Sequence, residues 1–273
     1  MTATLEHTTR EVQSKRLAAI KPSLTVAATA KMNALKAAGQ DIVVLTSGTP
    51  DFDTPEHIKR AAAEAMARGE TKYTEVGGTR ALRQAIAEKF KRDSGVDYGI
   101  DEIMISTGGK QVIFNTMLAT LDPGDEVVIP APCWVSYPDI VTLAEGRPVI
   151  VPCAAETGFK LTAEQLEAAI TPKTRWFLLN NPCNPSGAVY SEAELRTLCD
   201  VLLRHPDVLI LTDDIYEKIV FGTKAVTVVE VEPRLRSRTV TMNGCSKTYA
   251  MTGWRIGFCG APVPLIKAMS KLQ

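Results

Sequence analysis

Short apolar runs of strand length recur along the chain and set the strongest limit on its fold. They lie at residues 103–106, 126–129, 148–151, 176–180, 208–212 and 239–242. Helical patterns fill most of the intervals, at residues 80–92, 110–121, 163–170 and 192–203. Strands that alternate with helices in this way predict an α/β fold, with a mostly parallel central sheet and helices on both of its faces.

The two ends of the chain carry further patterns. Residues 25–38 have helical composition that stops at Gly39, and the apolar residues 42–45 predict a short strand. Residues 264–273 have the spacing of an amphipathic helix without a C-terminal cap. We therefore expect the sequence to continue in a longer protein.

The overall composition describes an ordinary globular protein, with 45% hydrophobic residues, 23% charged residues and zero formal net charge. This balance favours neither nucleic acid nor a membrane as a partner, and residues 1–16 lack the apolar core of a signal peptide. No run approaches a membrane span, so the cytoplasm is the expected location. Six scattered cysteines and three isolated histidines predict reduced thiols and no metal site.

The most informative stretch for function is the run NGCSKTYAMTGWRIGF at residues 243–258. It contains Lys247, with Ser246 beside it and Arg255 eight residues further on. A lysine on a glycine-punctuated loop near such groups suits an amine that forms a Schiff base beside a bound phosphate. An ordinary solvated lysine is the alternative, but the apolar neighbours predict partial burial, which lowers the pKa of a lysine and frees the neutral amine.

A second run, STGGKQ at residues 106–111, follows a predicted strand and opens a predicted helix. Its backbone N–H groups would point at an anion with the helix dipole behind them. A plain strand-to-helix turn is the alternative, whereas a Walker A loop is excluded because Met104 and Gln111 break that pattern. Arg255 and Ser246 would complete a phosphate cradle, unless they are surface residues.

The run around Lys247 closely resembles the cofactor-lysine signature of class I aminotransferases, which are fold-type I pyridoxal-phosphate enzymes. The resemblance covers about residues 15–273 and implies that Lys247 is the catalytic residue, with pyridoxal 5'-phosphate as cofactor. It implies an N-terminal arm with part of a small domain at residues 1–45, and a cofactor-binding large domain at residues 46–273 that is incomplete at its C-terminus. The family's arginine for the substrate α-carboxylate lies beyond this chain, so no arginine here receives that role.

The same resemblance implies which residues bind the cofactor's phosphate. The family's phosphate-binding positions match four residues of this chain, namely Gly109, Lys110, Ser246 and Arg255. A tyrosine that the family supplies from the neighbouring subunit matches Tyr73. This last match implies a homodimer with shared sites.

Asp213 ends an apolar run and matches the family's aspartate that pairs with the protonated ring nitrogen of the cofactor. Such a carboxylate keeps the ring an electron sink. An isolated aspartate in this place would otherwise be read as a helix N-cap or a turn residue. Asp214 stands where relatives often carry glutamate, so we assign the ring-nitrogen role to Asp213 alone.

Tyr216 and Asn184 match the donors to the cofactor's phenolic oxygen, and Trp134 matches the aromatic residue that stacks on its ring. Without the resemblance, Asn184 would be a turn residue and Trp134 an ordinary core tryptophan. Trp134 and Asn184 also fall at substrate-binding positions. Gly48 matches the position whose backbone approaches the substrate carboxylate, and Lys110 the lysine used toward an acidic substrate's distal carboxylate.

The segment KPSLT at residues 21–25 resembles the amino-terminal segment of the prokaryotic aspartate aminotransferase subgroup. The implied reaction is amino transfer from L-aspartate, or a similar amino acid, to 2-oxoglutarate, with Lys247 as general base and acid. One alternative keeps the cofactor but performs elimination or cyclisation, as in carbon–sulfur lyases and aminocyclopropane-carboxylate synthases. The other is a catalytically incompetent fragment that only binds the cofactor or a partner.

Overall fold

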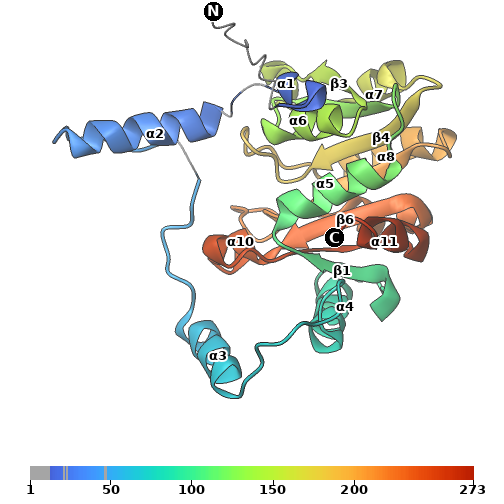
Figure 1. Ribbon diagram of the computed structural model, residues 1–273. Coiled ribbons are helices and arrows are strands. Elements are labelled where there is room, and N and C mark those ends of the chain that lie inside the picture. Colours follow the sequence, from blue (N-terminus) through green and yellow to red (C-terminus); the bar gives the residue numbers. More distant parts are fainter. Residues whose placement is uncertain (1–12, 21, 23, 46–47) are drawn as a thin grey trace, which may run out of the picture.

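The computed structural model describes residues 13–20, 22, 24–45 and 48–273, and its centre is a seven-stranded sheet with the order β1-β7-β6-β5-β4-β2-β3 (Figure 1). The strands are β1 (Ile103–Ser106), β2 (Glu126–Ala131), β3 (Arg147–Pro152), β4 (Thr174–Asn180), β5 (Leu209–Asp213), β6 (Thr239–Gly244) and β7 (Gly257–Gly260). Neighbouring strands are parallel, except that β7 runs antiparallel to both β1 and β6. The predicted α/β fold with a mostly parallel sheet is confirmed.

Helices cover both faces of the sheet, and each face has a large hydrophobic core. One face packs against α5 (Gly109–Thr120), α6 (Ser136–Leu143) and α11 (Val263–Ser270). The other packs against α7 (Ala163–Ala169), α8 (Glu192–Arg204) and α9 (Val228–Val231). The buried strands between them are apolar on both sides, as expected of a parallel sheet.

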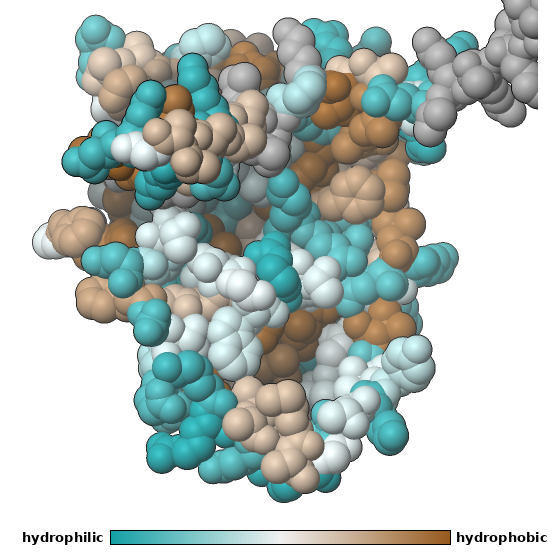
Figure 2. Space-filling model, turned by 60° about the vertical axis from the view of Figure 1, so that its left-hand side comes forward, coloured by the Kyte–Doolittle hydropathy of each residue, from teal (hydrophilic) through white to brown (hydrophobic). Residues whose placement is uncertain are grey.

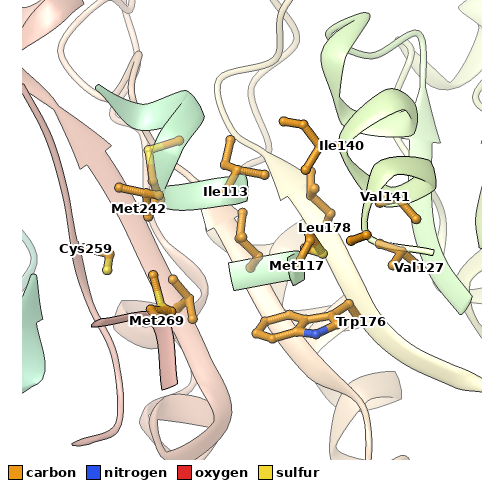
Figure 3. Close-up of a cluster of buried hydrophobic side chains, with 14 of the residues drawn as sticks. Ile113, Met117, Val127, Ile140, Val141, Trp176, Leu178, Met242, Cys259 and Met269 are labelled. Carbon is orange, nitrogen blue, oxygen red and sulfur yellow. The ribbon is translucent and has the colours of Figure 1, made fainter. Parts of the chain in front are cut away.

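Strand β4 contributes side chains to both of these cores. Successive side chains of a strand point to opposite faces. Trp176 and Leu178 therefore enter the core under α5, which Figure 3 shows, whereas Phe177 and Leu179 enter the core under α8. Local signals set the helix ends, since α8 begins at a capping box in which Ser191 caps the backbone of Glu194.

The N-terminal part of the described chain is less closely packed. It contains α1 (Lys15–Ala18), α2 (Leu24–Ala37) and α3 (Glu56–Ala67), and it leads into α4 (Arg80–Ser94), which packs against β1 and β7 in a third, smaller hydrophobic core. Figure 1 shows α2 and α3 on extended connections outside the body formed by the sheet and its helices. The face in Figure 2 mixes apolar and polar residues, and exposed apolar side chains of the molecule include Val43, Leu45 and Phe52.

The predicted strands and helices outside residues 42–45 are found within a few residues of their expected bounds. The predicted strand at residues 42–45 is wrong, because this segment pairs with no strand of the sheet in the described part of the chain. Val43 is 85% and Leu45 90% exposed, so the apolar run does not enter the core. Among the described helices, none is long and apolar enough to cross a membrane.

Candidate active site

A cavity of about 960 Å³ opens at the carboxyl ends of β4, β5 and β6, beside the start of α5. Ligands of open α/β sheets bind at this edge, because the loops that leave the strands there converge. Ten of the residues singled out in the sequence line this cavity. They are Gly48, Gly109, Lys110, Trp134, Asn184, Asp213, Tyr216, Ser246, Lys247 and Arg255.

Lys247 lies on the short helix α10 (Cys245–Thr248), directly after β6. Burial lowers the pKa of its amine from the ordinary value, as the apolar neighbours in the sequence predict. The Lys247 Nζ donates a hydrogen bond to the carbonyl oxygen of Gly48 and lies 5.8 Å from the ring centroid of Tyr216. The amine therefore faces the cavity and is more readily neutral than a solvated lysine.

A glycine-lined surface lies where β1 ends and α5 begins. A Cβ atom added at Gly257 of β7 would lie 2.2 Å from the carbonyl carbon of Gly108 and 2.3 Å from the nitrogen of Gly109. A Cβ at Gly108, whose φ is 95°, would lie 2.4 Å from the Arg255 Nη2. The start of α5 and strand β7 can approach each other this closely only because both carry glycines. Backbone N–H groups of α5 therefore lie beside the Arg255 guanidinium.

Two more of the predicted phosphate residues flank this surface. Ser246 is buried in the first turn of α10. Lys110 lies in the first turn of α5, and its Nζ is 5.0 Å from the ring centroid of Trp134, in a cation–π contact. Trp134 in turn packs edge-on against Tyr137, with ring centroids 5.3 Å apart. The Lys110 ammonium thus lies between the glycine-lined surface and the aromatic wall of the cavity.

Asp213 ends β5 and is 4% exposed. Its carboxylate accepts a hydrogen bond of 2.6 Å from the Tyr137 hydroxyl and one of 3.2 Å from the backbone N–H of Ile215. Burial raises the pKa of Asp213 to about 6, and the two hydrogen bonds oppose this rise. A buried carboxylate of this kind is well suited to a protonated ring nitrogen, which would stabilise its ionised form.

Asn184 and Tyr216 meet on the remaining side, where the Asn184 Nδ2 donates to the Tyr216 hydroxyl at 3.4 Å. Asn180 supports this side, because its Oδ1 accepts from the Asn184 backbone at 2.7 Å and its Nδ2 donates to the Asp213 carbonyl at 2.8 Å. Asn180 and Tyr137 were not predicted as site residues. Their only sequence signal is that they stand close to Asn184 and Trp134 along the chain.

Tyr73 is the one predicted site residue that the structure does not bring to the cavity, since its side chain is fully exposed. Its predicted role in a neighbouring subunit's site stays a prediction. Lys21 and Ser23 of the segment 21–25 lie outside the described residues. In the described part of the chain, no group of three His, Cys, Asp or Glu side chains could hold a metal ion.

Asp214 faces away from the large cavity, into a separate pocket of about 220 Å³ that it shares with Asp93 and Glu217. Burial raises its pKa to about 8, with Glu217 and Asp213 adding to the rise. Because the folded state holds this proton more tightly than the unfolded chain, the stability that it contributes is present at low pH and is lost as pH rises through 8.

We expect Asp214→Asn to remove this loss of stability. Between pH 6 and pH 8 the free energy of unfolding of the unmodified protein should fall, and in the variant it should stay level, so that the variant is more stable at pH 8 by on the order of a few kcal/mol. Urea unfolding at several pH values measures this, with the exposed Asp200→Asn as control. Parallel pH profiles for Asp214→Asn and the unmodified protein would contradict the assignment.

Tyr137→Phe should raise the pKa of Asp213 above its value of about 6, because the lost hydroxyl donates to the ionised carboxylate. Carbon NMR of protein labelled at the aspartate carboxyl groups follows the titration directly. Tyr190→Phe is a matched control, since this buried tyrosine bonds to the backbone of Leu161 instead. An Asp213 titration that is the same in Tyr137→Phe and the unmodified protein would refute the role of the hydroxyl.

The fold and the cavity together define an α/β protein with a partly buried lysine, a glycine-lined anion surface and a buried carboxylate at one sheet edge. Residues 40–273 match the family model of aminotransferase class I and II. The chain belongs to this family, and its members depend on pyridoxal phosphate.

Particular relatives are similar over nearly the whole chain. An aspartate aminotransferase of Rhizobium meliloti (strain 1021) and an aspartate/prephenate aminotransferase of Cereibacter sphaeroides are each 56% identical over 95% of this chain. The chain spans only 64% of the first and 65% of the second.

Solved structures agree with the fold. The aspartate aminotransferase of Rhizobium meliloti superimposes with a TM-score of 0.92 at 56% identity, covering 95% of this chain and 65% of that one. The Thermus thermophilus aspartate aminotransferase with maleate also gives a TM-score of 0.92, at 44% identity, covering 95% and 67% respectively.

Proposed function

We propose that this protein transfers the amino group of L-aspartate, or a similar amino acid, to 2-oxoglutarate. The observation that carries the proposal is the position of Lys247, whose amine has a lowered pKa and lies in one cavity with the buried Asp213. A readily neutral amine can accept the proton of an amino acid's α-carbon, and a buried carboxylate can pair with the protonated ring nitrogen of the cofactor.

The residues of the cavity fit pyridoxal phosphate. The surface formed by Gly108, Gly109 and Gly257 excludes side chains and sets Arg255 beside backbone N–H groups, which suits a phosphate. Trp134 offers an aromatic face. When bound, the cofactor supplies an aldehyde for the substrate amine and a ring that stores an electron pair.

Three further tasks fall to residues of this chain. Lys247 accepts a proton from the substrate's α-carbon, and its lowered pKa makes the neutral amine more available for this step than that of a solvated lysine. Asp213 stays ionised opposite a positive ring nitrogen, and Tyr137 holds its carboxylate in place. The hydrogen-bonded pair of Asn184 and Tyr216 donates to an anionic oxygen of the bound group.

An acidic substrate is favoured by Lys110, whose ammonium lies over Trp134 at the cavity wall and suits a second carboxylate. The names of the relatives support aspartate, with prephenate as a further amino acceptor class in some of them, and the Thermus relative was solved with a dicarboxylic acid, maleate. The homodimer with Tyr73 donated across it, the domain boundary near residue 45 and the cytoplasmic location remain our predictions from the sequence.

The test is an assay of the purified protein with pyridoxal phosphate, L-aspartate and 2-oxoglutarate. We expect oxaloacetate and glutamate to form in equal amounts, with no product when the oxoacid is omitted beyond one turnover per site. Release of pyruvate and ammonia without an oxoacid would instead identify a lyase. The assay is run on this chain and on an extended protein, because the relatives are about one and a half times as long.

A further inference from the structure

Residues 48–54 lead into α3 and cross the loop that follows Lys247. Two contacts join them to that loop through a single side chain. The Thr54 hydroxyl donates to the carbonyl oxygen of Ala250 at 2.6 Å, and it accepts from the indole Nε1 of Trp254 at 3.0 Å. A third contact is the hydrogen bond from the Lys247 Nζ to the Gly48 carbonyl.

Ala250, whose carbonyl accepts from Thr54, is also hydrogen-bonded to the backbone of Lys247. Ala250 has a φ of 51°, in the left-handed region that residues with a side chain seldom adopt. Its backbone N–H donates to the Lys247 carbonyl at 3.4 Å, and the next N–H, of Met251, donates to the Ser246 carbonyl at 3.1 Å. Unfavourable backbone geometry persists where the surroundings over-determine it, and Thr54 supplies one of those constraints.

The segment of residues 48–54 also depends on Thr54 to fix its position. Gly48 is exposed and Phe52 is 78% exposed, so packing does little to fix the residues between them. Thr54, in contrast, is half-buried and uses its hydroxyl as both donor and acceptor. A hydroxyl with both functions engaged fixes the distance between two backbone segments more closely than either bond alone.

We propose that Thr54 is a positioning residue that holds the Gly48 carbonyl against the Lys247 amine and keeps that amine aimed into the cavity. It acts through Gly48 and Ala250 and touches neither substrate nor cofactor. The inference rests on the proposed function, in which this amine is the group that captures the aldehyde. The contact that carries the inference, from the Thr54 hydroxyl to the Ala250 carbonyl, joins residues 196 positions apart in the sequence.

The test compares Thr54→Val, which keeps the shape and loses the hydroxyl, with Thr54→Ser, which keeps the hydroxyl. Each protein is mixed with pyridoxal phosphate between pH 6 and pH 10, reduced with borohydride at timed intervals, and digested, and the label on the Lys247 peptide is measured by mass spectrometry. We expect Thr54→Val to slow labelling by about three- to tenfold, as the loss of one or two modest hydrogen bonds would. Thr54→Ser should stay within about twofold of the unmodified chain.

A second variant and a second readout separate positioning from general damage. Trp254→Phe removes only one of the two bonds and should slow labelling by less than Thr54→Val. Amide exchange at Ala250 and Met251, whose N–H groups donate to the Lys247 and Ser246 carbonyls, should quicken in cofactor-free Thr54→Val and not in Thr54→Ser, while exchange in β5 and β6 stays unchanged.

Equal labelling rates and equal exchange in Thr54→Val and the unmodified chain would overturn the role of Thr54. If the unmodified chain captures no cofactor at Lys247 while it is folded, the proposed function fails instead. Amide exchange at Ala250 and Met251 then tests the role of Thr54 independently of the cofactor.

Discussion

Replacing Lys247 by alanine is expected to abolish the visible absorption band that the protein develops with pyridoxal phosphate, and to lower any turnover by on the order of 10⁶-fold. The reason is that, among the described residues that line the cavity, the only other amine is that of Lys110, which lies over Trp134 at the wall. Titration of each protein with pyridoxal phosphate, followed by absorption spectroscopy, measures the effect.

The control for this variant is Lys271→Ala, which removes an exposed lysine outside the cavity. It should give the same band as the unmodified protein. A band of full intensity in Lys247→Ala would show that the aldehyde reacts elsewhere, and would remove Lys247 from its proposed place in catalysis.

Gly257→Ala is expected to have the second largest effect, on both stability and cofactor affinity. Its Cβ would lie 2.2 to 2.7 Å from three backbone atoms of Gly108 and Gly109, and backbone in this position cannot move aside as the end of a side chain can. Overpacking of this kind costs about 1–3 kcal/mol or more in free energy of unfolding. The displaced loop should also weaken binding of pyridoxal phosphate by about tenfold or more.

Gly253→Ala is a matched control from the same region of the chain, because a Cβ there would meet no atom within 4 Å. Urea unfolding and fluorescence titration with pyridoxal phosphate are measured for both variants. Normal stability and normal affinity in Gly257→Ala would mean that the close approach of β7 to the start of α5 does not exist in solution.

Strands β1 and β4 could be predicted from the sequence because local pattern and tertiary environment agree there. The run at residues 103–106 became β1 with the same bounds, and the run at 176–180 forms most of β4. Both runs are apolar except for a polar last residue, and most of their side chains are buried. The run at 42–45 has the same local character but no neighbouring strand, and a pattern in one segment cannot tell whether a partner exists.

Strand β7 was missed for the opposite reason. Its sequence is Gly-Phe-Cys-Gly, and two glycines in four residues weaken any strand pattern. The structure explains both of them, since a Cβ at Gly257 would strike the backbone of Gly108 and a Cβ at Gly260 would lie 2.4 Å from the ring of Tyr98. The glycines are required by neighbours distant in sequence, which local propensity does not reveal.

The same limit applies to the cavity. The resemblance to the family brought together ten residues that do line one cavity, from Gly48 to Arg255. Tyr137 and Thr54 carry no such signal, because each acts through a hydrogen bond to a distant part of the chain. Tyr137 reaches across 76 residues to Asp213, and Thr54 across 196 residues to Ala250. Such supporting contacts become visible only when the fold places both partners.

The most direct test of the proposed amino transfer is the absorption spectrum of this chain with bound pyridoxal phosphate before and after addition of L-aspartate. We expect the visible band that depends on Lys247 to decay as the amino group passes to the cofactor, and to return when 2-oxoglutarate is added. A band that forms on Lys247 but does not change with aspartate or any other amino acid would contradict amino transfer by this cavity.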